Sequence, residues 1–156
     1  MTAWKFRDAR PEDAACVAEL VNHAFQVERP FKSGERTDAA QVAAMLTKGR
    51  FLLMEDASGV AACVYLEPRE RHIYMGMLSV APERQGLGLG TRMLAEVEKQ
   101  SRDSGYEALD LRFVHLRDDL HAYYSKRGFV ETGAESAEGI PSFTVPVHFV
   151  RMSKAL

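Results

Sequence analysis

Residues 80–91 read Val-Ala-Pro-Glu-Arg-Gln-Gly-Leu-Gly-Leu-Gly-Thr, between an apolar run and a helix-period pattern. This order predicts a strand that leads through a glycine-rich loop into the N-terminus of a helix. The main-chain N–H groups of such a loop are unpaired, and the positive end of the helix dipole lies behind them. Glycines at 86, 88 and 90 let the backbone approach a ligand closely, since no Cβ intervenes. The segment therefore indicates a phosphate or pyrophosphate site, with a structural helix cap as the alternative.

The spacing of the glycines argues against two common classes of phosphate-binding loop. The loop lacks the lysine of a Walker loop, and G-x-G-x-G differs from the dinucleotide fingerprint. No acidic constellation for magnesium accompanies it, which disfavours an ATP-dependent enzyme. The residues Gln85, Gly88 and Gly90 match Q/R-x-x-G-x-G/A, and in this the loop resembles the acetyl-CoA-binding motif of the GNAT acyltransferase superfamily.

A second segment, Tyr123-Tyr124-Ser125-Lys126-Arg127-Gly128-Phe129, resembles the Y-x-K-x-G-F motif of the same superfamily. The resemblance implies that the Tyr124 hydroxyl lies near the thioester sulfur and protonates the departing thiolate of CoA. A tyrosine pKa near 10 suits an acid at neutral pH. Tyr123 is the neighbouring candidate, and a tyrosine packed in the core is the alternative reading.

The resemblance also implies a set of residues that bind acetyl-CoA, with no metal involved. Leu78 and Val80 would contribute main-chain groups to the pantetheine arm, and Arg84 and Gln85 would add side-chain contacts. Arg84 reads equally well as a solvated surface charge. The pyrophosphate would lie on the backbone of Gly86, Leu87, Gly88, Leu89, Gly90 and Thr91.

Two positions depart from the superfamily pattern. Arg117 stands where many members carry asparagine, and Gly76 and Met77 stand where many carry the glutamate that serves as general base. The base is therefore unidentified, with three candidates at strand ends, Glu67, His72 and His115. Proton removal by water is the remaining option.

The resemblance implies an acceptor site opposite the CoA arm, lined by residues 26–36 and 133–146. Charges of both signs occur in the first segment. Three glutamates in or just before the second, Glu131, Glu135 and Glu138, would as an acidic rim favour a cationic amine, with a solvated face as the alternative. We therefore expect an acetyl-CoA-dependent N-acetyltransferase that transfers acetyl directly to a primary amine of a small molecule or peptide. The alternative is a non-catalytic acyl-CoA-binding module on the same fold.

Sequence patterns predict the elements that position these residues. Strands are expected at 4–7, 50–55, 60–67, 72–80, 108–114, 129–132 and 144–152, with Gly76 indicating a bulge or the close approach of another backbone. Helices are expected from Pro11 to Phe25, from Asp38 (or Thr37 as cap) to Gly49, and at 88–104 and 118–126. Periodicity supports only a mixed α/β domain. The resemblance adds the GNAT fold, with a mixed sheet, splayed fourth and fifth strands and the order β-α-α-β-β-β-α-β-α-β-β.

Composition bounds the remaining possibilities. The 156 residues predict one domain, 1–156, and a net charge of −2 gives no basic field for nucleic acid. No apolar run is long enough to span a membrane, and residues 1–5 show no signal-peptide pattern. Cys16 and Cys63 lie in apolar patterns, which predicts buried free thiols in a reducing, cytoplasmic compartment. Composition does not distinguish a monomer from a homodimer.

Overall fold

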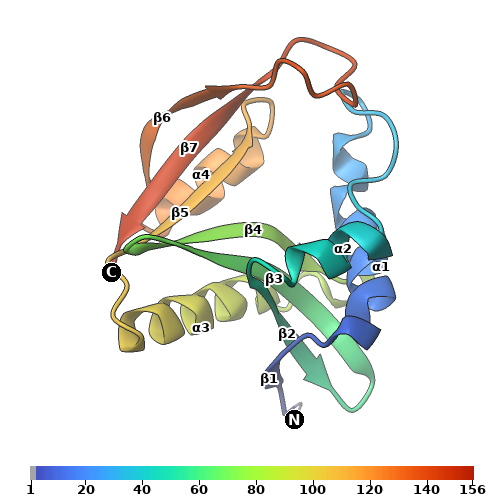
Figure 1. Ribbon diagram of the computed structural model, residues 1–156, viewed down its shortest axis with the longest axis vertical. Helices are drawn as coiled ribbons and strands as arrows, with labels where there is room; N and C mark the ends of the chain where they lie inside the picture. Colours follow the sequence, from blue (N-terminus) through green and yellow to red (C-terminus); the bar gives the residue numbers. More distant parts are fainter. Residues whose placement is uncertain (1–2) are drawn as a thin grey trace.

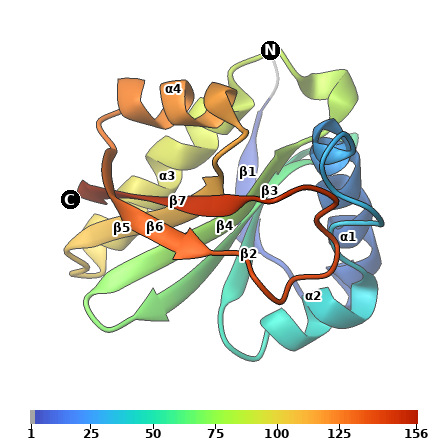
Figure 2. The same ribbon diagram turned by 90° about the horizontal axis from the view of Figure 1, so that it is seen from above.

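Seven strands form one mixed sheet, with α1 and α2 on one face and α3 and α4 on the other (Figures 1 and 2). The computed structural model describes residues 3–156; residues 1–2 of the N-terminal segment lie outside it. The elements are β1 (Lys5–Asp8), α1 (Ala14–Ala24), α2 (Ala39–Met45), β2 (Arg50–Asp56), β3 (Gly59–Arg69), β4 (His72–Val80), α3 (Leu89–Asp103), β5 (Ala108–Val114), α4 (Asp118–Lys126), β6 (Val130–Ser136) and β7 (His148–Ala155). Short 3₁₀ helices occur at Pro11–Asp13, Phe25–Glu28 and Pro82–Arg84. This order of helices and strands confirms the one expected from the resemblance.

The core is two-sided because successive residues of a strand point to opposite faces of the sheet. In β2, Phe51 and Leu53 pack toward α1 and α2, whereas Leu52 and Met54 pack toward α3. Every one of these four side chains is buried. A continuous apolar run in β2 therefore indicates a strand covered on both faces.

The fourth and fifth strands separate along their length, as predicted. The strands follow the order β1-β2-β3-β4-β5-β7-β6, and all neighbours are antiparallel except β4 and β5. That parallel pair is in register only from His72 to Tyr74 and from Ala108 to Asp110. Beyond Tyr74 the β4 edge that faces β5 has no strand partner, and the two strands diverge (Figure 1).

A β-bulge in β4 confirms the one predicted near Gly76. Tyr65 of β3 pairs with Gly76, but Cys63 pairs with Ser79, so Met77 and Leu78 together oppose one residue of β3. The left-handed backbone falls on Met77, with φ of 53°, rather than on Gly76. The extra residue inverts the alternation of β4, because Met75 packs on the α3 side and Met77 packs on the α1 side.

Several expected boundaries and one burial prediction need correction. The segment expected to be a loop after residue 25 contains the 3₁₀ helix Phe25–Glu28. β6 continues to Ser136 and β7 begins only at His148, after Pro146, which has no N–H to donate to a strand. Cys63 is buried and free as expected, but Cys16 is free and exposed, because the buried stripe of α1 runs along its neighbours Ala14, Val17 and Val21.

Candidate active site

A cavity of about 350 Å³ occupies the space where β4 and β5 diverge. Its walls come from Tyr74–Leu78 of β4 and Leu111–Val114 of β5, with Tyr124 of α4 at one side. The segment between α1 and α2 and the segment before β7 cover it. The splay of the two parallel strands is therefore the origin of the cavity.

The two covering segments are joined to each other by main-chain hydrogen bonds. The N–H of Ser33 donates to the carbonyl of Ser142 at 2.7 Å, and the N–H of Thr144 donates to the carbonyl of Phe31 at 3.0 Å. Figure 2 shows the chain before β7 passing beside the segment that links α1 to α2. The two stretches expected to line an acceptor site thus meet over the same cavity.

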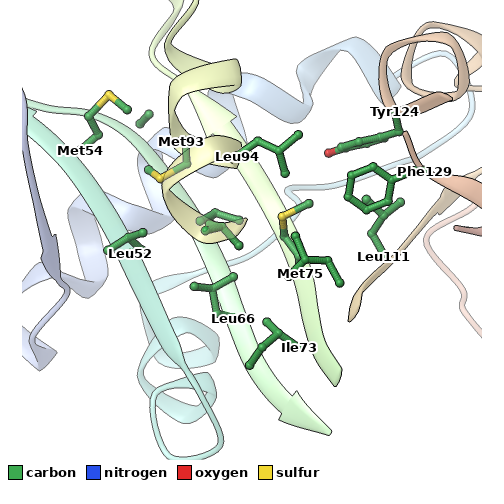
Figure 3. Packing of buried hydrophobic residues seen from close by; sticks show 14 of the residues in the cluster. Leu52, Met54, Leu66, Ile73, Met75, Met93, Leu94, Leu111, Tyr124 and Phe129 are labelled. Atoms are coloured by element: carbon green, nitrogen blue, oxygen red, sulfur yellow. The ribbon is translucent and has the colours of Figure 1, made fainter. Parts of the chain in front are cut away.

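Tyr124 lines the cavity from α4 and is buried. Its ring packs between Phe113, at 6.2 Å between centroids, and Phe129, at 5.3 Å. Figure 3 shows its hydroxyl pointing from α4 toward Leu94 of α3. Burial raises the pKa of the Tyr124 hydroxyl above its usual value, so this group carries its proton at neutral pH.

Tyr123 has a different environment, although it is adjacent in sequence. Its hydroxyl lies 3.1 Å from Oγ1 of Thr91, and the Arg127 guanidinium stacks over its ring at 3.6 Å. Tyr123 is half-buried and does not line the cavity. Of the two tyrosines, the one that the Y-x-K-x-G-F register selects, Tyr124, is thus the one that lines the cavity.

The glycine-rich loop presents a row of free main-chain donors. Within the described part of the chain, none of the N–H groups of residues 86–91 donates a main-chain hydrogen bond, and the first such donor is Arg92. Gly86 and Gly88 have φ of 84° and 74°, values that disfavour a side chain. A Cβ at either position would meet nothing within 4 Å, so the space beside the loop is open. This arrangement suits an anion at the start of α3.

The other residues expected to bind the cofactor lie along the same path from β4 to α3. The side chains of Leu78 and Val80 are half-buried against the α3-side core. Leu89 is buried and anchors the first turn of α3, whereas Leu87 is exposed. Thr91 is exposed and contacts Tyr123. The segment from Leu78 to Thr91 thus runs from the edge of the cavity through the glycine-rich loop into α3.

The side chains of Arg84 and Gln85 are engaged within the protein. Arg84 forms a two-point ion pair with Asp56, at 2.9 and 3.2 Å, and its guanidinium lies 5.4 Å from the Trp4 ring. Gln85 donates from Nε2 to the carbonyl of Val80 at 3.4 Å. Arg84 therefore ties the loop to the end of β2, and it is a half-buried, paired charge rather than a solvated surface charge.

None of the three candidate bases lines the cavity. Glu67 accepts a hydrogen bond from the Tyr65 hydroxyl at 2.8 Å, and His72 lies 2.7 Å from Asp110 where β4 and β5 are still paired. His115 stacks on His148 with 4.2 Å between ring centroids. The structure therefore does not bring these three side chains together with Tyr124.

The charges that line the cavity differ from the acidic rim expected from residues 131–138. Glu131, Glu135 and Glu138 all lie outside it, and Glu135 pairs with Arg112 at 2.7 Å. Inside it, Glu28 is buried and pairs with Arg117 at 2.8 Å. This pair joins residues 89 positions apart, so no local pattern in the sequence could have indicated it.

Residues 3–156 form neither a metal site nor a membrane-spanning helix. No group of three or more His, Cys, Asp or Glu side chains is placed to hold a metal ion. No helix of this part of the chain is both long and apolar enough to cross a membrane.

Comparison with known proteins identifies the family. The model of the Acetyltransferase (GNAT) family matches residues 15–129, which include β4, the glycine-rich loop, α4 and the residues after α4 up to Phe129. This chain belongs to the GNAT acetyltransferase family. The glycine-rich loop and the tyrosine segment that suggested the resemblance both lie inside the matched region. The chain is accordingly an acyltransferase.

Individual relatives agree with this GNAT membership. The L-amino acid N-acyltransferase MnaT of Escherichia coli (strain K12) is 28% identical over 143 residues, covering 81% of this chain and 79% of the relative. Two solved structures share the fold at low identity. The ribosomal-protein-S18-alanine N-acetyltransferase of Escherichia coli has a TM-score of 0.79 at 14% identity, covering 98% of this chain and 94% of the other. A GNAT acetyltransferase of Elizabethkingia anophelis, solved with acetyl-CoA bound, has a TM-score of 0.73 at 16% identity over 98% of both chains.

Proposed function

We propose that this GNAT acetyltransferase transfers an acetyl group from acetyl-CoA directly to the primary amine of a small molecule or peptide. The observation that carries the proposal is the double role of α4. Tyr123 contacts the start of α3 beside the free N–H groups, and Tyr124 faces the cavity between β4 and β5. A ligand with a pyrophosphate at one end and a reactive thioester at the other fits this arrangement.

The residues have separate roles in this proposal. The N–H groups of residues 86–91 hold the pyrophosphate, and the unpaired edge of β4 near Leu78 and Val80 binds the pantetheine arm. The amine nitrogen attacks the thioester carbonyl carbon, the carbon–sulfur bond breaks, and Tyr124 gives its proton to the leaving sulfur. We assign the proton lost from the amine to water, because Glu67, His72 and His115 lie outside the cavity.

Direct transfer, without an acyl-enzyme, is supported by the positions of the cysteines. Cys63 is buried in the core cluster on the α1 side, and Cys16 is exposed on α1. Neither lines the cavity, so no thiol is placed to accept the acetyl group. The L-amino acid N-acyltransferase activity named for MnaT supports amines as the class of acceptor.

Two measurements on the purified protein test the proposal. Acetyl-CoA at a hundredfold excess over its Kd should raise the Tm by about 5–10 °C, and ATP should raise it far less. A panel of primary amines, assayed by release of the CoA thiol, should contain substrates that produce the N-acetyl product. If every amine leaves CoA release at the rate of hydrolysis, or if ATP stabilises as well as acetyl-CoA, the proposal is wrong.

A further inference from the structure

Arg36 lines the cavity without a partner for its charge. Its side chain is half-buried, and the guanidinium lies 5.4 Å from the centroid of the Phe25 ring. Within residues 3–156 it forms no ion pair and no side-chain hydrogen bond. Withdrawing a guanidinium from water without an anion is unfavourable, so the position is unusual for a purely structural arginine.

The other two arginines at this cavity are neutralised. Arg112 pairs with Glu135 at 2.7 Å, and Arg117 pairs with both Glu28 and Asp119, at 2.8 and 2.9 Å. The buried carboxylate of Glu28 is therefore already held by Arg117 and is not a partner in contact with Arg36. Glu28 acts on Arg36 only through its field, which raises the pKa of Arg36 against the larger effect of burial, and Glu35, the other acid at this cavity, forms no ion pair with it in the described residues.

A second cation reinforces the first. Lys32 also lines the cavity without an ion pair in the described residues, and its ammonium lies 5.2 Å from the centroid of the Phe143 ring. Burial, and next the charge of Arg36, lowers the pKa of the Lys32 ammonium. Burial likewise lowers the pKa of Arg36. An anion between these two side chains would offset both effects.

We propose that Arg36, supported by Lys32, binds a carboxylate of the acceptor, so that the acceptors are amines that also carry a carboxylate. This inference rests on the proposed N-acetyltransferase function. A guanidinium matches a carboxylate through two parallel hydrogen bonds, which fixes orientation as well as charge. The remaining wall includes Phe25, Phe143 and Phe149, which favours an amino acid with an apolar side chain.

The test compares L-phenylalanine with phenethylamine, which lacks only the carboxylate. The wild-type chain should prefer L-phenylalanine in kcat/KM. Arg36→Gln should lower that preference by about 10- to 100-fold, mainly through the KM of L-phenylalanine, because charge-assisted hydrogen bonds are lost. Arg36→Lys keeps the charge without the planar fork and should fall between the two. Arg29→Gln is the matched control, since Arg29 is an exposed arginine of the same segment that does not line this cavity.

Binding of L-phenylalanine, measured by calorimetry on the CoA-saturated protein, separates this inference from the function on which it rests. Binding that Arg36→Gln abolishes and Arg29→Gln retains supports the carboxylate site, even if no amine is turned over and the proposed function fails. Equal turnover of L-phenylalanine and phenethylamine by the wild-type chain, with no binding effect of Arg36→Gln, overturns the carboxylate site and leaves the transferase function standing.

Discussion

The two adjacent tyrosines of α4 show how residues of one type acquire different chemistry from their surroundings. Successive residues of a helix are about 100° apart, so Tyr123 and Tyr124 cannot face the same neighbours. Tyr124 is buried among aromatic rings at the cavity, whereas the Tyr123 hydroxyl forms a hydrogen bond with Thr91 at the start of α3. The acid that we propose must stay protonated and lie at the reaction site; burial keeps the proton on Tyr124, and Tyr124 lines the cavity.

Removing the Tyr124 hydroxyl should therefore affect the chemical step. Tyr124→Phe should lower kcat by about 10²- to 10⁴-fold with little change in stability or in acetyl-CoA binding, because the proton is needed only when sulfur leaves. Steady-state kinetics of CoA release measure this. Tyr123→Phe is the control and should lose only a few-fold, through its bond to Thr91. Reversed results would show that Tyr123, and not Tyr124, is the acid.

At the scale of elements, two irregularities of the chain around β4 build the site. The bulge at Met77 inverts the alternation of β4 just beyond the point where β4 parts from β5. The glycine-rich loop then brings to the start of α3 six N–H groups, those of residues 86–91, that make no main-chain hydrogen bond within residues 3–156. Left-handed backbone at a non-glycine residue costs about 1–3 kcal/mol, and such strain is common at functional sites.

The loop conformation leads to a prediction about Gly88. Gly88→Glu should abolish the rise in Tm caused by acetyl-CoA, because the new side chain and its negative charge would occupy the place of the pyrophosphate. Differential scanning fluorimetry with and without acetyl-CoA measures this.

Gly105→Glu is the matched control for the strain alone. Gly105 also has a positive φ, 86°, with open space around it, but it follows the other end of α3. This variant should lose a similar amount of stability and keep its response to acetyl-CoA. A full response by Gly88→Glu would place the pyrophosphate elsewhere.

At the scale of the whole molecule, an ion-pair cluster fastens the N-terminal strand to the sheet. Arg7 of β1 bonds both carboxylate oxygens of Asp13, at 2.8 and 3.1 Å, and also bonds Glu55 of β2 at 3.0 Å. The main-chain N–H of Arg10 donates to Asp13 at 2.7 Å. The hydrogen bonds from Arg7 are the main cause that lowers the pKa of Asp13 to about 2.

This pKa predicts how stability responds to acid. The folded pKa of Asp13 lies below its unfolded value, so its contribution is present above that value and is lost as the pH falls toward about 2. Asp13→Asn should therefore lower the free energy of unfolding at neutral pH by about 1–2 kcal/mol, and by almost nothing near pH 2.

Urea unfolding across this pH range measures the contribution of Asp13. Glu12→Gln is the neighbouring control. The Glu12 carboxylate is exposed and 3.7 Å from Arg10, so we expect a change within about 0.5 kcal/mol at any pH. A loss for Asp13→Asn that stays constant down to pH 2 would show that the charge of Asp13 is not the cause.

The sequence by itself determined the features that depend on residues close together along the chain. The glycine spacing at 86, 88 and 90 and the motif around Tyr124 led to the GNAT family, and the bounds of β4, β5 and α4 agree with their hydrophobic patterns. Gly76 predicted the bulge correctly to within one residue. These features are local because backbone freedom, capping and periodicity act over a few residues.

Only the tertiary structure decided which charges meet in the cavity. The pairing of Glu28 with Arg117 and the engagement of Arg84 by Asp56 depend on segments that are distant in sequence. So does the position of Arg36, which has no ion pair within residues 3–156. The sequence pattern alone does not distinguish the charged residues that are exposed from those that line the cavity, because both kinds are neighbours along the chain. Their roles depend on the distance to the nearest opposite charge and on exclusion of water, and the packing of the whole chain sets both.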